Sequence, residues 1–127
     1  MTVALWCILI AIFLPYICTA IAKVSGRYTL KDNHDPRDFL ESLNGVGRRA
    51  HAAQLNGFEV TPAFAAAVIV AHLAGNAELV TINVLSVLFI TSRLLYIICY
   101  LADWAILRSL MWLVGMGLIA SFFVVSV

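Results

Sequence analysis

Four long apolar stretches dominate the pattern of hydrophobic and polar positions along the chain. About 20 apolar residues in an α-helix, at a rise of about 1.5 Å per residue, cross a hydrocarbon layer of about 30 Å. The stretches therefore predict membrane-spanning helices over residues 2–22, 46–74, 77–102 and 104–127. The last three are joined by short turns, which forces neighbours to run antiparallel. We expect an all-α fold, an integral membrane four-helix bundle that forms a single domain over residues 1–127.

A polar segment, residues 23–47, separates the first two predicted helices. Within it, Asp35-Pro36 indicates a turn, and residues 38–43 have the pattern of a short helix. Pro62 predicts a local kink in the second membrane helix, of a kind that neighbouring helices tolerate. The chain thus has one long loop and two minimal ones.

The first apolar stretch ends in Ala20-Ile21-Ala22, a pattern that signal peptidase can cleave. No basic residue precedes the stretch, and it is longer than the usual apolar core of a signal peptide. We therefore favour a retained membrane helix over a cleaved signal peptide.

Composition agrees with a membrane protein and adds an orientation. Of the 127 residues, 63% are hydrophobic and 12% charged, and the mean hydropathy is +0.99, far from the composition of soluble domains. Because cytoplasmic loops carry the excess of Lys and Arg, we expect the long loop in the cytoplasm and both termini outside. The local charge excess gives no sign of a nucleic-acid-binding surface. Six of the eight basic residues lie in or beside the loop: Lys23, Arg27, Lys31, Arg37, Arg48 and Arg49.

Cysteine and histidine positions argue against metal chemistry. The three cysteines lie in apolar stretches without CxxC or Cys/His spacing, so we interpret them as packing residues and predict no metal site. His34 and His51 are interpreted as solvated and His72 as interfacial.

Three ionisable residues, Glu59, Arg93 and Arg108, lie inside predicted membrane helices. A charge in the bilayer costs at least about 2.5–3.5 kcal/mol, so each needs a partner or an aqueous cavity. Glu59 and Arg93 each lie about ten residues, or about 15 Å, from the cytoplasmic ends of antiparallel helices. The carboxylate and the guanidinium are therefore expected to meet. An ion pair that only fixes helix register is the alternative interpretation.

Helical spacing places further polar residues at the depth of Glu59 and Arg93 and so predicts a polar site there. Polar side chains recur at intervals of three and seven residues on the second and third helices, which places them on one face of each helix. A basic and a hydroxyl residue follow in the first turn of the fourth. The set is Arg49, Asn56 and Glu59; Arg93, Tyr96 and Tyr100; and Arg108 with Ser109. This surplus of cationic donors suggests an anionic ligand.

The stretches "RAHAAQLNGFEV", "SRLLYIICY" and "LRS" together resemble the MAPEG family, the membrane-associated proteins in eicosanoid and glutathione metabolism. The similarity covers nearly the whole chain, and small bacterial members have about this length. The resemblance implies a homotrimer in the bacterial inner membrane, with active sites between protomers that open to the cytoplasm. Each site would bind glutathione as co-substrate.

The resemblance also implies roles for individual residues. Those matching glutathione-binding positions are Gln54, Asn56, Glu59, Arg93, Tyr96 and Tyr100, and Arg49 lies on the same face as Asn56. Arg108, with Ser109 beside it, matches the arginine that activates the thiol. The chain departs from the eukaryotic synthases at Ala52, where they carry arginine, and at Val60, where one carries tyrosine.

The implied chemistry is physically coherent. A thiol with a pKa of about 8.5 is mostly protonated at neutral pH, and a guanidinium favours the thiolate, which is the nucleophile. The thiolate would attack a lipophilic electrophile that arrives through the bilayer, as in a glutathione transferase or peroxidase. Two alternatives remain open: a non-catalytic lipid-binding or scaffold protein, and a proton-coupled transporter using Glu59. Pairing with arginine favours a permanently charged carboxylate, which is a poor proton carrier.

Overall fold

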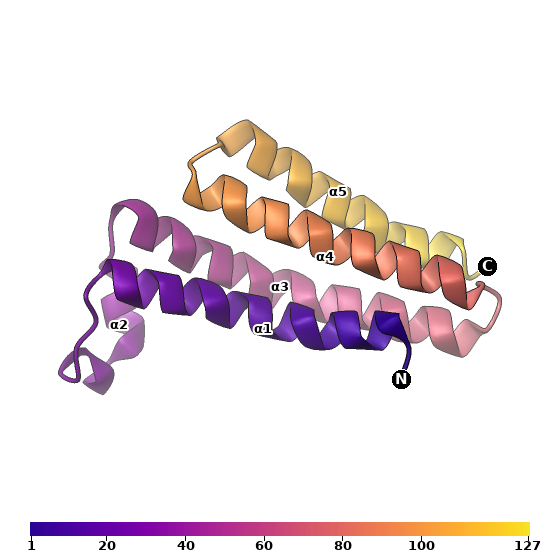
Figure 1. The fold of residues 1–127 in the computed structure, drawn as a ribbon, viewed down its shortest axis with the longest axis horizontal. Helices are drawn as coiled ribbons and strands as arrows, with labels where there is room; N and C mark the ends of the chain where they lie inside the picture. The colour runs from indigo at the N-terminus through magenta and orange to yellow at the C-terminus, as the bar shows by residue number, and fades with distance from the viewer.

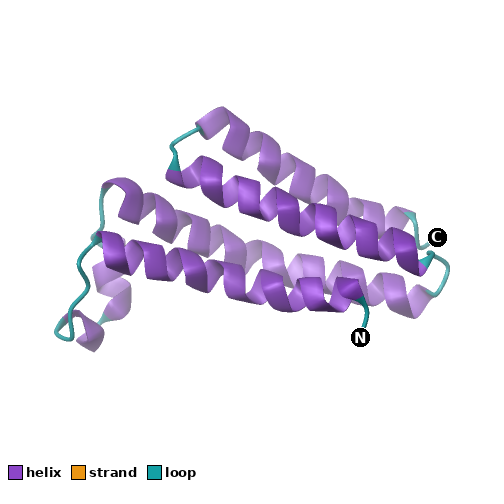
Figure 2. Ribbon diagram, viewed as in Figure 1, coloured by secondary structure: helices purple, strands orange, loops and turns teal.

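The computed structural model describes residues 1–127 and contains helices and connecting loops only (Figure 2). In chain order the elements are α1 (Val3–Ser25), the 3-10 turn η1 (Asp32–His34), α2 (Pro36–Glu41), α3 (Gly45–Ala74), α4 (Leu79–Leu101) and α5 (Ala105–Val124). Figure 1 shows α1 beside α3 and α4 beside α5, and α3 also contacts α4 and α5. Both termini lie at one end of the bundle, and α2 projects from the other.

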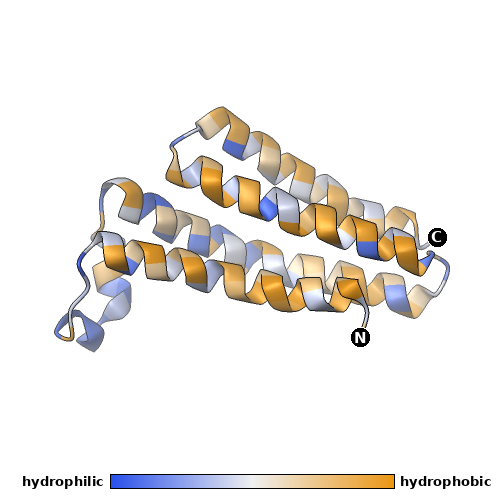
Figure 3. Ribbon diagram, viewed as in Figure 1, coloured by the Kyte–Doolittle hydropathy of each residue, from blue (hydrophilic) through white to orange (hydrophobic).

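Four helices, α1, α3, α4 and α5, are long and apolar enough to cross a membrane. Hydrophobic residues cover most of their length, and hydrophilic positions gather around α2, with others scattered along α3, α4 and α5 (Figure 3). The predicted class, an all-helical multi-pass membrane protein with four spans, is confirmed. α3 continues through Pro62 as one helix.

The long loop differs from expectation at its helical segment. α2 begins at Pro36 rather than at residue 38, because Asp35 is its N-cap and accepts a hydrogen bond from the Asp38 backbone N–H at 3.1 Å. A proline at the first helical position loses no hydrogen bond, since that N–H has no partner in a helix. Asp35-Pro36 therefore starts a helix and does not form a separate turn. Leu40 anchors α2 in a small buried cluster with Ala22, Leu43 and Ala50.

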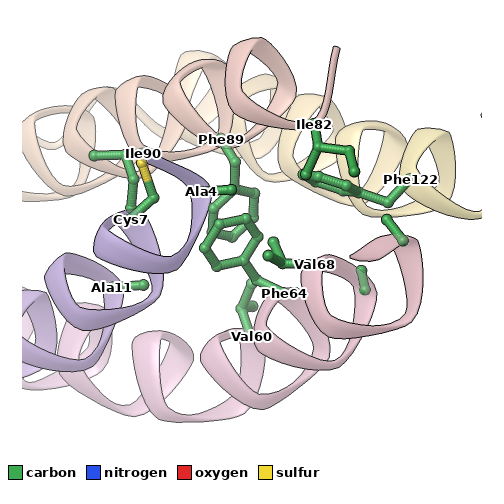
Figure 4. Close-up of a cluster of buried hydrophobic side chains, with 12 residues drawn as sticks. Ala4, Cys7, Ala11, Val60, Phe64, Val68, Ile82, Phe89, Ile90 and Phe122 are labelled. Atoms are coloured by element: carbon green, nitrogen blue, oxygen red, sulfur yellow. The ribbon is translucent and has the colours of Figure 1, made fainter. Parts of the chain in front are cut away.

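The main core joins α3, α4 and α5 through aromatic rings (Figure 4). Phe64 stacks on Phe89 with centroids 4.0 Å apart and meets the edge of Phe122 at 6.0 Å. All three rings are almost completely buried. Cys7 from α1 packs in the same cluster, and all three cysteines are buried and unpaired.

A close contact between α1 and α3 sets the rotation of α3. A Cβ added at Gly57 would lie only 2.7 Å from Cγ of Pro15, so only glycine allows the helices to approach this far. One turn later the hydroxyl of Thr61 donates to the carbonyl of Ala11 at 3.2 Å. With Gly57 held against α1, Asn56, one residue earlier, faces α4.

Candidate functional site

Arg93, Asn56 and Glu59 form a chain of hydrogen bonds between α4 and α3. The Nη2 group of Arg93 donates to Oδ1 of Asn56 at 2.8 Å, and Nδ2 of Asn56 donates to Oε2 of Glu59 at 3.4 Å. The expected direct contact between Arg93 and Glu59 is wrong. Glu59 is one turn further along α3 and is exposed, so the guanidinium reaches the nearer amide first.

Arg93 is buried beneath Asn56 and Glu59 and is not accessible from the surface of the bundle. Its side chain is only 5% exposed, its Cζ lies 4.2 Å from the ring centroid of Tyr96, and its Nη1 is buried without a hydrogen-bond partner. A guanidinium in this position orients Asn56 and supplies positive charge next to Glu59. It does not present a free donor fork to a ligand.

Arg108 occupies the exposed end of the same aromatic stack. Its Cζ lies 4.5 Å from the ring centroid of Tyr100, and the Tyr96 and Tyr100 rings meet edge to face at 5.7 Å. The two arginines are thus joined through two tyrosines in the order Arg93, Tyr96, Tyr100, Arg108. Beside the stack is an open cavity of about 290 Å³, lined by Tyr96, Tyr100, Arg108, Ser109, Trp112 and Leu113. Arg108 is half-buried there and is the accessible cation of this surface.

Arg49 is hydrogen-bonded to the backbone at the end of α4. Its Nε and Nη2 donate to the carbonyl of Leu101 at 3.4 and 3.2 Å. Cations favour the C-terminal ends of helices, where the last carbonyls lack intrahelical partners. Arg49 therefore ties the start of α3 to the end of α4 and stays outside the hydrogen-bonded chain of Asn56 and Glu59.

Gln54 faces away from the other predicted site residues. It precedes Asn56 by two positions, which is about 160° around a helix. Its side chain is buried, and Nδ1 of His51 donates to its Oε1 at 3.1 Å. Both residues line a cavity of about 360 Å³, here called the α2 cavity, together with Arg37, Leu40, Glu41, Leu55 and Phe58.

Sequence reasoning missed the α2 cavity and assigned His51 to solvent. The spacing of three between His51 and Gln54 was the available signal, since such residues are neighbours on a helix surface. His72 also has specific partners: its Nδ1 donates to the carbonyl of Val68 at 2.8 Å, and its Nε2 accepts from the Thr2 hydroxyl at 3.1 Å. No group of three or more His, Cys, Asp or Glu side chains gathers closely enough to hold a metal ion.

Comparison with known proteins gives one match. The sequence model of the MAPEG family matches residues 3–127, nearly the whole chain. No curated protein matches the chain, and no solved structure matches it either.

Proposed function

The chain belongs to the MAPEG family, the membrane proteins of glutathione and eicosanoid metabolism, and from this premise we propose that it is a membrane-bound glutathione-dependent transferase or peroxidase. Its second substrates are lipophilic electrophiles. We further propose a homotrimer in a bacterial inner membrane, with the α2 end of the bundle in the cytoplasm and both termini outside.

The observation that carries the proposal is the position of Arg108. Its guanidinium is stacked on Tyr100 and lines an open cavity together with Ser109, Trp112, Leu113 and the two tyrosines. A cation held where polar side chains meet apolar ones favours the thiolate over the thiol of a bound glutathione. Trp112 and Leu113 are exposed apolar residues of α5 that line this cavity, and they give a lipophilic substrate a route from the bilayer.

The reaction follows from this arrangement. The glutathione thiol loses its proton to solvent, and Arg108 stabilises the negative sulfur. The sulfur lone pair then forms a bond to the electrophilic centre, and the leaving group departs with the electron pair of the broken bond. We assign Glu59 to the ammonium of glutathione and Asn56, Tyr96 and Tyr100 to its other polar groups, with Ser109 beside the thiol.

Conjugation of glutathione to 1-chloro-2,4-dinitrobenzene by the purified protein tests the proposal. We expect saturable turnover, and a loss of about 10²–10³-fold in kcat for Arg108→Ala, as for other lost charge-stabilising donors. Because the guanidinium lowers the pKa of the bound thiol, the variant should also need a higher pH to reach half of its maximal kcat, the parameter that reports ionisation in the enzyme–substrate complex. Lys31→Ala, which removes an exposed loop cation, is the control. Full turnover in Arg108→Ala would overturn the role of Arg108.

A non-catalytic lipid-binding or scaffold protein is the second candidate. The observation that favours it is the buried contact of Arg93 with Asn56, which fixes α3 against α4 without any ligand. Calorimetric titration distinguishes the two functions. Binding of glutathione at millimolar or lower concentration supports the enzyme, and no binding at millimolar thiol supports the second candidate.

A further inference from the structure

A small cavity lies inside the bundle where α1, α3 and α4 meet. Its volume is about 10 Å³, and most of its lining residues are buried. Ala11 and Cys18 line it from α1, Thr61 from α3 and Arg93 from α4. A cavity of about 10–15 Å³ holds one water molecule when two to four polar groups are placed to bond with it. The hydrogen-bonding state of the lining groups therefore decides what the cavity binds.

Arg93 brings a donor without a partner to this cavity. Its side chain is 5% exposed, its Nη2 donates to Oδ1 of Asn56, and its Nη1 is buried without a hydrogen-bond partner. Glu59 is joined to the guanidinium only through the amide of Asn56. Leaving a buried donor unpaired is costly, and more so when the group is charged. Nη1 therefore requires an acceptor from the cavity side.

The carbonyl of Ala11 brings a matching acceptor. Pro15 lies inside α1 and has no N–H, so the carbonyl four residues before it has no intrahelical donor. The hydroxyl oxygen of Thr61 is 3.2 Å from this carbonyl and 2.7 Å from the carbonyl of Gly57. A hydroxyl has a single proton, which these two carbonyls must share. The Ala11 carbonyl can therefore accept from a further donor.

We propose that one water molecule binds in this cavity, accepts a hydrogen bond from Nη1 of Arg93 and donates one to the carbonyl of Ala11. The hydroxyl of Thr61 and the thiol of Cys18 line the same cavity and can take the second proton and the second lone pair of the water. Through this water the guanidinium is tied to α1, while Nη2 ties it to α3 at Asn56. The inference does not depend on the proposed function.

A crystal structure of the full chain, at a resolution that shows ordered water, is the direct test. We expect one density peak within about 3.2 Å of both Nη1 of Arg93 and the carbonyl oxygen of Ala11. The lack of such a peak would overturn the inference. Crystals soaked in bromide separate water from a small anion. An anomalous peak in the cavity would show that a halide neutralises Arg93, and would overturn the assignment to water.

Cys18→Val tests the site by thermal unfolding in detergent, with Cys7→Val as the matched control. Both cysteines are buried in α1, but Cys7 packs in the apolar core and does not line the cavity (Figure 4). Valine at position 18 takes up cavity volume and offers neither donor nor acceptor. We expect a midpoint several degrees below that of Cys7→Val, because the water is displaced and Arg93 loses its partner. Filling a dry cavity would stabilise the protein, so a midpoint at or above the control contradicts the inference.

Solid-state NMR of the protein in lipid bilayers separates loss of water from poor packing. With ¹⁵N-labelled arginine, the guanidinium protons of Arg93 should receive magnetisation from bound water in the wild type. The transfer should disappear in Cys18→Val. It should persist in Cys18→Ser, which keeps a small polar side chain beside the water. No transfer in the wild type, or equal transfer in the valine variant, would rule out the proposed water.

Discussion

At the scale of the residue, the candidate site depends on an amide placed between two charges. Asn56 accepts from buried Arg93 and donates to exposed Glu59, so it joins a positive group inside the bundle to a negative group at its surface. A direct ion pair would have neutralised Glu59 within one chain. The amide link instead leaves the carboxylate turned outward, where a ligand ammonium can reach it.

Asn56→Leu and Glu59→Gln separate the structural role of Asn56, as partner of buried Arg93, from the proposed role of Glu59 in ligand binding. Removing Asn56 leaves Arg93 buried without its hydrogen-bond acceptor, so we expect a loss of about 1–3 kcal/mol in stability, measured by thermal unfolding in detergent. Glu59→Gln keeps an acceptor for Asn56 and should unfold within a few degrees of the wild type, but bind glutathione at least tenfold more weakly. A Glu59→Gln variant less stable than Asn56→Leu would contradict this division.

At the scale of the element, the contact between α1 and α3 decides which face of α3 is available. Gly57 lies against the ring of Pro15, and Thr61 bonds to the backbone of α1 one turn later. In a bilayer, small residues allow helices to approach closely, and van der Waals packing replaces the hydrophobic effect as the main attraction. This packing leaves Asn56 facing α4 and Gln54 facing α2.

Gly57→Ala tests the contact, with Gly117→Ala as its matched control. A methyl group at position 57 would lie 2.7 Å from Pro15, whereas at position 117 nothing lies within 4 Å. Both residues are inside helices, so alanine should be neutral or slightly stabilising at 117 and destabilising by about 1–3 kcal/mol at 57. Thermal unfolding of both variants in one detergent provides the comparison. Equal unfolding midpoints for the two variants would show that the bundle accommodates a methyl group at position 57 without losing stability, and would contradict the prediction.

At the scale of the whole molecule, the bundle has two unlike ends. One end carries α2, the turn at Asp103 and most of the basic residues, and the other carries both termini (Figure 1). The cavity beside Arg108 and the α2 cavity both lie in the half nearer the basic end. Under the proposed function, a water-soluble thiol and a membrane-dissolved electrophile would reach the cavity beside Arg108 from different phases.

The proposed orientation predicts the behaviour of reporters fused to the C-terminus. Because this orientation keeps the basic loop in the cytoplasm, alkaline phosphatase fused after Val127 should be active and green fluorescent protein there should be dark in bacterial cells. Alkaline phosphatase fused within the loop, after Lys31, should be inactive and serves as the control. The reverse pattern would place the site outside the cytoplasm, away from the cellular thiol, and would contradict the proposed arrangement.

Sequence by itself determined the four membrane helices, the polar α2 end and the common depth of Glu59 and Arg93. These features depend on the length, apolarity and rise of individual helices, which are local properties of the chain. Helical spacing also placed Tyr96 and Tyr100 with Arg93, and the structure stacks them together.

Only the tertiary structure decided how these residues divide between surfaces. Asn56 separates Glu59 from Arg93, Arg49 bonds to the end of α4, and Gln54 joins His51 in the α2 cavity. Each outcome depends on the rotation of α3. That rotation is set by a contact between Pro15 and Gly57, which are separated by 41 intervening residues, about the length of two membrane helices. Periodicity places residues on a face of a helix, but packing between distant segments determines what that face meets.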